Sequence, residues 1–216
     1  MKAVATAFHR QTFTLKTVSL LFLTRMFTAV LLAGAVLAMV LTNDRIWWHA
    51  HFSVLGGGDE LSSHIFNGTL IAGGILLGVI SLKFGSELSR ANLKPQRKVA
   101  RVIVEYSFMC MGVGMLVAGL VPYDVFYELH FTAANIMAAA FLLLAVCLRP
   151  ALPDISNNAL FATYGATLLI ILVYAVHYIA HKINMTIMEV CIGLLFFIWL
   201  ELFTRSILRL TRPQVS

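Results

Sequence analysis

Long apolar runs separated by short polar stretches dominate this chain. Six such runs lie at about 22–42, 65–84, 102–121, 129–148, 159–180 and 187–204. A helix needs ~20 apolar residues to cross the hydrocarbon core of a bilayer. The runs are continuously apolar rather than alternating, and backbone groups in lipid must be satisfied within each segment, so each run predicts a transmembrane helix. The expected fold class is an all-α integral membrane protein, a six-transmembrane-helix bundle.

Composition supports this interpretation. The 216 residues are 60% apolar and 12% charged, and the mean hydropathy is +0.87. Charged residues make up about a quarter of a typical soluble domain. We therefore divide the chain into a basic N-terminal segment (1–21), a six-helix transmembrane domain (22–204) and a basic tail (205–216).

The basic residues predict the orientation of the bundle. Fourteen of the 16 lysines and arginines fall beside the ends of the runs that share a side with both termini, and only Arg45 and Lys182 fall on the other side. Because positive charge collects on the cytoplasmic side, we expect both termini to be cytoplasmic. This asymmetry also explains the net charge of +6, so no nucleic-acid partner is expected. The predicted location is a plasma membrane or a bacterial inner membrane.

Candidate chemistry gathers on the predicted outer side, around the short connection within residues 121–135. Asp124 and His130 lie in this stretch, and His177 and His181 stand one turn apart on one helix face. Imidazoles and carboxylates together are suited to a divalent metal. We predict that His130, His177, His181 and Asp124 can share an ion such as zinc. The alternative is that these histidines are interfacial anchors, like the neighbouring tyrosines.

Several polar and small residues have simpler structural interpretations. Asp124 also fits a helix cap, and Thr186 and Glu189 match a capping box at the start of the last helix. Glu105 and Glu201 each have an arginine four positions away, which predicts surface ion pairs. Gly74 and Gly78, four residues apart, predict a tightly packed helix face.

Several short motifs carry a resemblance to a known family. They are Ser53-Val-Leu-Gly56, Ile65-Phe-Asn67 with the following Gly-Thr-Leu-Ile-Ala-Gly-Gly74, Gly119-Leu-Val-Pro122-Tyr-Asp124, His130-Phe-Thr-Ala-Ala134, Met188-Glu189 and Phe197-Ile-Trp199. With these motifs the chain resembles a bacterial six-helix membrane family of unknown function, related to the DRAM-like (Frag/DRAM/Sfk) membrane proteins. The resemblance implies a polar outer pocket with Ser53, Asn67, Asp124, His130 and Glu189 as site residues. His64, which opens the second run, is placed at the same level.

Three functions are compatible with these features. The first is a DRAM-like protein that binds membrane lipids or a membrane-protein partner, including a second copy of itself, through the outer pocket. The second is a zinc-dependent hydrolase acting at the outer leaflet, since His177-x3-His181 resembles the last-helix motif of ceramidase and progestin-receptor type membrane hydrolases. Those proteins have seven helices and a Ser-x3-His motif that this chain lacks. The third is a small transporter, although few polar residues occupy the helix centres.

Overall fold

The computed structural model describes residues 18–43, 45–90, 95–179, 181 and 183–211. These residues form six long helices, two short 3-10 helices and no strand: α2 (Leu20–Leu41), η1 (Ile46–Trp48), η2 (Phe52–Gly56), α3 (Leu61–Arg90), α4 (Pro95–Leu120), α5 (Tyr127–Ala151), α6 (Asn157–Tyr178) and α7 (Met185–Thr211). All six long helices are long and apolar enough to span a membrane. The predicted all-α class and six-helix count are confirmed for this part of the chain.

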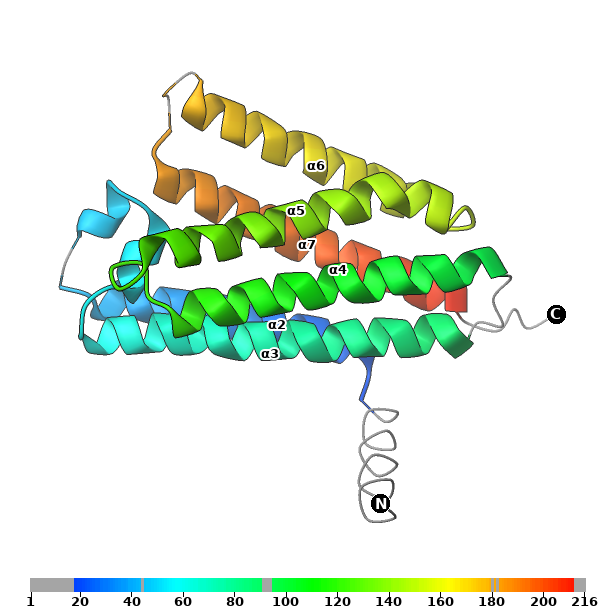
Figure 1. The fold of residues 1–216 in the computed structure, drawn as a ribbon, viewed down its shortest axis with the longest axis horizontal. Helices are drawn as coiled ribbons and strands as arrows, with labels where there is room; N and C mark the ends of the chain where they lie inside the picture. Colours follow the sequence, from blue (N-terminus) through cyan, green and yellow to red (C-terminus); the bar gives the residue numbers. More distant parts are fainter. Residues whose placement is uncertain (1–17, 44, 91–94, 180, 182, 212–216) are drawn as a thin grey trace, which may run out of the picture.

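Consecutive helices run antiparallel and form one bundle (Figure 1). α3 packs against α2 and α4, α4 packs against α5, and α7 returns to lie against α6 and α2. η1 and η2 lie at one end of the bundle, with the α4–α5 and α6–α7 connections (Figure 1). We name this end the loop end and the opposite one the terminal end. The predicted cytoplasmic side corresponds to the terminal end.

The α3–α4 contact depends on glycine, as the sequence predicts. A Cβ added to Gly74 would lie 2.6 Å from the backbone nitrogen of Leu116 and 2.7 Å from the carbonyl oxygen of Gly112. Only a residue without a side chain lets the two backbones approach this closely. The second glycine of the predicted pair, Gly78, is less tightly enclosed, since the nearest atom to its added Cβ is Met109 Sδ at 3.9 Å.

Aromatic rings fill the core toward the middle and terminal end of the bundle. Phe84 of α3 lies 4.7 Å from Phe108 of α4 and 5.4 Å from Phe203 of α7, measured between ring centroids. Trp199 stacks on Phe203 at 5.0 Å, and its indole N–H donates to the buried Thr163 hydroxyl of α6 at 2.9 Å. The hydrogen bond satisfies the polar edge of the indole, so the ring can stay in the core.

Several charged residues toward the terminal end form ion pairs. The predicted pairs Arg101–Glu105 (3.2 Å) and Arg205–Glu201 (2.7 Å) are confirmed. Arg25 of α2 also reaches Glu201, at 2.9 Å, and so ties α2 to α7. Lys83 of α3 has a side chain that is only 3% exposed, and its ammonium group lies 3.5 Å from Glu87.

Packing is looser toward the loop end, on the side formed by α6 and α7. The buried residues of α6 all lie between Ala159 and Ala166, in the half nearer the terminal end. In α7, no residue between Met188 and Trp199 is buried. α6 diverges from α5 in the direction of the loop end (Figure 1). A Cβ added to Gly165 would have open space around it.

The glycine contact predicts a contrast between two substitutions. Gly74→Ala should destabilise the protein by about 1–3 kcal/mol, since a methyl group pressed against backbone atoms forces α3 and α4 apart. Gly165→Ala should be neutral or stabilise by up to about 1 kcal/mol, through helix propensity alone. Thermal unfolding of the purified protein in detergent measures both. Equal unfolding midpoints for the two variants would contradict a tight α3–α4 contact.

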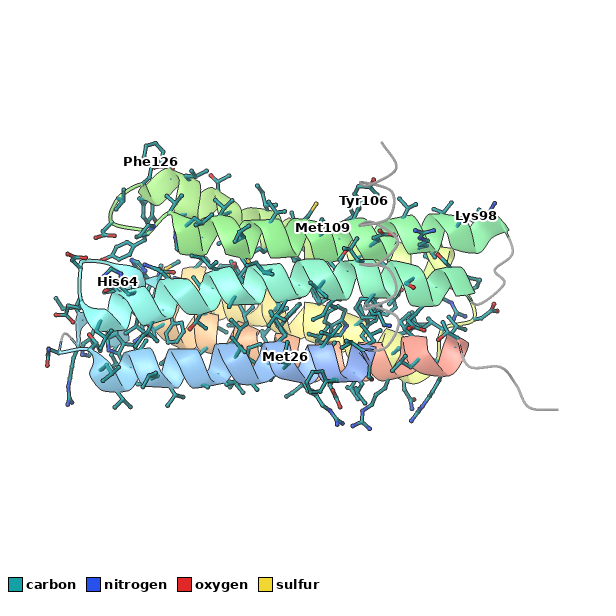
Figure 2. All side chains as sticks on the ribbon, turned by 90° about the horizontal axis from the view of Figure 1, so that it is seen from below. Met26, His64, Lys98, Tyr106, Met109 and Phe126 are labelled. Carbon is teal, nitrogen blue, oxygen red and sulfur yellow. The ribbon has the colours of Figure 1, made fainter. Side chains whose placement is uncertain are left out.

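The orientation predicted by the basic residues can be tested with two single-cysteine variants. Asp59, whose side chain is 100% exposed, lies at the loop end near His64, and the exposed Lys98 lies at the opposite end (Figure 2). In a background with Cys110, Cys147 and Cys191 replaced by alanine, Asp59→Cys should react with a membrane-impermeant maleimide on intact cells, and Lys98→Cys should react only after lysis. The reverse pattern would place the termini outside.

Candidate functional site

Residues 45–60, which we name the cap loop, fold onto the loop end of the bundle. Leu55 of η2 is 2% exposed and packs in a small apolar cluster with Ala38 of α2 and Phe66 of α3. Phe52 lies 5.4 Å from Phe66 and 6.2 Å from Trp47, both in edge-to-face geometry. The apolar residues of the loop therefore dock it on the helix ends, and its polar backbone must find partners there.

Three site residues expected from the sequence supply those partners. The Glu189 carboxylate of α7 accepts a hydrogen bond from the Phe52 backbone N–H at 2.5 Å. Asp124 of the α4–α5 connection accepts one from the Gly58 N–H at 2.8 Å, and the Asn67 amide of α3 donates to the Gly56 carbonyl at 2.8 Å. Hydrogen bonds with a charged partner are about twice as strong as neutral ones. We name this set the cap clasp.

Gly56 is required by its closeness to Asn67. A Cβ at this position would collide with the Asn67 amide. The side-chain oxygen of Asn67 is buried and has no hydrogen-bond partner. The amide is thus held by its donor group alone, and any side chain at position 56 would displace it.

The start of α7 adds contacts that sequence reasoning missed. The Asn184 side chain donates to the Trp48 carbonyl at 2.6 Å and accepts from the Ile187 backbone N–H at 2.9 Å, so it caps the helix. Thr186 donates to the Trp47 carbonyl. The expected Thr186–Glu189 capping box is therefore wrong: both side chains bond the cap loop. An Asn just before a helix was the available signal for the cap, but nothing local points to Trp47 or Trp48.

The four predicted metal ligands are not brought together. His130 Nδ1 lies 2.9 Å from the Val121 carbonyl, and His177 Nδ1 lies 2.9 Å from the Ile183 carbonyl. His181 follows the end of α6 in a left-handed conformation, with φ of 51°, and Asp124 belongs to the cap clasp. Among the described residues, no group of three or more His, Cys, Asp or Glu side chains could hold a metal ion.

The remaining candidates lie around the cap loop. His64 faces Asp59 on the surface, with Nε2 and Oδ1 3.2 Å apart, and Ser53 is half-buried on η2. His130 is 8% exposed, so its side chain is buried in the bundle. Their positions agree with the expected level of the site, at the loop end.

His51 links the cap loop to the α4–α5 connection. Its ring meets Tyr123 edge-on, with centroids 4.7 Å apart. Burial lowers the pKa of His51 below its ordinary value, and the nearby His130 lowers it further. A neutral imidazole can pack against the phenol ring without the cost of burying a charge.

Two hollows open at the loop end. The larger one, the basic hollow, has a volume of about 530 Å³ and is lined by Met39, Val40, Thr42, Arg45, Trp47, Trp48 and His49. The smaller one, the acidic hollow, has a volume of about 220 Å³ and is lined by Thr42, Trp47, Val54, Leu55, Gly57, Gly58, Glu60, Ser62, Ser63 and Tyr123. Thr42 and Trp47 line both, so the two hollows are neighbours.

Comparison with known proteins identifies the family of the chain. A family model described as a protein of unknown function (DUF998) matches residues 26–206. This fits the expected resemblance to an uncharacterised membrane family, but nothing in it links the chain to DRAM-like proteins. No curated protein and no solved structure matches the chain.

The cap clasp predicts that removing one carboxylate loosens the loop. Glu189→Ala should raise hydrogen exchange at the Phe52 amide and its neighbours by about tenfold, as expected when a buried N–H donor loses its acceptor at a cost of about 1–3 kcal/mol. Glu189→Gln should raise exchange less, since it keeps an acceptor oxygen. Hydrogen-exchange mass spectrometry in detergent measures the effect. Glu128→Ala is the control, because Glu128 is exposed at the same end and bonds no described residue. Unchanged exchange in Glu189→Ala would exclude a role for the clasp in holding the loop.

Proposed function

This chain is a multi-pass membrane protein that belongs to the DUF998 family, and we propose that it binds a phospholipid of the surrounding bilayer in the basic hollow. The observation that carries the proposal is the combination, in one hollow, of lipid-facing apolar surface, an arginine and two tryptophans. Each of these matches a different part of a phospholipid.

The apolar part of the hollow continues the outer surface of α2. Val40 is 74% exposed and Met39 is half-buried. In a membrane-spanning helix such a surface faces the hydrocarbon chains of lipid. A lipid whose acyl chains lie along α2 would thus carry its headgroup to the hollow at the end of this helix.

The polar part supplies a match for phosphate. Arg45 is exposed and makes no ion pair with a described residue, and the exposed His49 lines the same hollow. A guanidinium group is suited to phosphate because it can donate two parallel hydrogen bonds to its oxygens. An arginine placed beside apolar surface at a membrane boundary is a natural phosphate partner.

The two tryptophans of the basic hollow also favour a position at the boundary between headgroups and hydrocarbon. Trp47 and Trp48 pack edge to face at 5.4 Å, and Trp48 is 49% exposed. Tryptophan is enriched where headgroups meet hydrocarbon. The volume of about 530 Å³ is in the range of small-molecule sites, about 300–1,000 Å³. With the predicted orientation, the lipid belongs to the outer leaflet of a plasma membrane or a bacterial inner membrane.

Binding to phospholipid can be compared with binding to a lipid that lacks phosphate. Native mass spectrometry of the detergent-purified full chain should show a preference for dioleoylphosphatidylglycerol and dioleoylphosphatidylethanolamine over dioleoylglycerol. Arg45→Gln should reduce this preference by about tenfold or more, the amount expected from a charged hydrogen bond. Arg45→Lys should retain part of it, since it keeps the charge but not the planar fork.

Arg209→Gln is the matched control, because Arg209 is an exposed arginine of α7 near the terminal end. It removes the same charge and should leave the preference nearly unchanged. Equal losses in Arg45→Gln and Arg209→Gln would reduce the effect to net charge and overturn the proposal. An unchanged preference in Arg45→Gln would point instead to a protein partner for this surface.

A further inference from the structure

The acidic hollow beside the basic hollow differs from it in chemistry. It contains Glu60 and no lysine, arginine or histidine. Its aromatic members are Trp47 and Tyr123, and its hydroxyl-bearing members include Ser62 and Ser63. A carboxylate beside aromatic rings is the combination that recognises ammonium groups, through charge and through the negative faces of the rings.

The Glu60 carboxylate is held in place on the hollow. The Ser62 hydroxyl donates to Glu60 Oε2 at 3.3 Å, and the Ser63 hydroxyl donates to the Gly57 carbonyl. Gly57 in turn lies against the Tyr123 ring, where an added Cβ would come within 2.5 Å of Cε1. The wall of the hollow is therefore fixed by contacts of the cap loop with α3 and the α4–α5 connection.

The two hollows share part of their lining and differ in the charge of the residues that line them. Arg45 lines one, Glu60 lines the other, and Trp47 lines both. In a zwitterionic phospholipid the phosphate and the ammonium group are joined by two carbon atoms. A headgroup lying across Trp47 would present its negative end to Arg45 and its positive end to Glu60.

We propose that the acidic hollow binds the ammonium end of a zwitterionic phospholipid whose phosphate occupies the basic hollow. This inference rests on the proposed function and adds the headgroup class. Glu60 is the residue that determines specificity, since it would repel a second anionic group and attract an ammonium group. Trp47 contributes the aromatic surface on which either a primary or a quaternary ammonium can lie.

The experiment measures competition between lipids of equal chain length on the full-length protein in detergent, by native mass spectrometry. Dioleoylphosphatidylethanolamine should be preferred over dioleoylphosphatidylglycerol by roughly fivefold, the size expected of one exposed ion pair and one cation–π contact. Glu60→Gln should abolish this preference, so that the two lipids bind about equally. The variant keeps the size of the side chain and an oxygen acceptor for Ser62.

A third lipid, dioleoylphosphatidylcholine, distinguishes the two sources of the ammonium group. Preference for it equal to that for the ethanolamine lipid would show that the aromatic wall dominates. A clear disadvantage would show that direct hydrogen bonds from a primary ammonium to Glu60 are required. Either result supports an ammonium site. A preference for dioleoylphosphatidylglycerol over both ammonium lipids would overturn it.

Glu128→Gln is the control for the loss of one negative charge at the same end. It should leave the ratio of bound dioleoylphosphatidylethanolamine to bound dioleoylphosphatidylglycerol unchanged. An identical ratio in the wild type and Glu60→Gln would overturn the inference about the acidic hollow. The proposed function would survive that result as long as Arg45→Gln still reduces the preference for phospholipid over dioleoylglycerol, so the two failures are distinguishable.

Discussion

The loop end depends on one constraint, the need of non-helical backbone for hydrogen-bond partners next to the bilayer. Helices satisfy their own peptide groups, whereas the cap loop leaves amides and carbonyls that need partners from other parts of the chain. Glu189 and Asp124 accept hydrogen bonds from two of these amides, and Asn67 donates one to a carbonyl. The clasp joins α3, α7 and the α4–α5 connection to a single loop. Residues far apart in the sequence are thereby fixed at one level.

The two hollows are consequences of this docking. Residues of η1 and of the end of α2 line the basic hollow together, so Arg45 and Trp47 share it with the exposed Val40. η2 lies against the start of α3, which leaves Glu60 beside Tyr123. Neither hollow is formed by the helix bundle alone, because each one takes part of its wall from the cap loop. A change in the clasp would therefore alter both hollows at once, even though no clasp side chain lines either of them.

Features that depend on local sequence could be predicted from the chain. The six helices follow from continuous apolar runs, and the pairs of Glu105 and Glu201 with arginines four positions away follow from helical geometry. The close approach at Gly74 follows from the absence of a side chain. The ion pairs could be predicted because both partners lie on one helix. The helices and the close contact could be predicted because apolar runs and small residues indicate them directly. Arg25 shows the limit, since its contact with Glu201 depends on how α2 packs on α7.

The level of the candidate site could also be predicted, but its pairings could not. Histidines and carboxylates at the ends of the apolar runs had to lie near one membrane boundary, and grouping them there suggested a metal site. The alternative partners were backbone groups, which every sequence contains and no side-chain pattern marks. His130 and His177 instead approach nearby carbonyls, and Glu189 reaches an amide 137 positions away. At the loop end, backbone groups of the cap loop and a bound ligand would compete for the same polar side chains. Arg45 and Glu60, the residues that we propose for ligand binding, both lie outside the clasp.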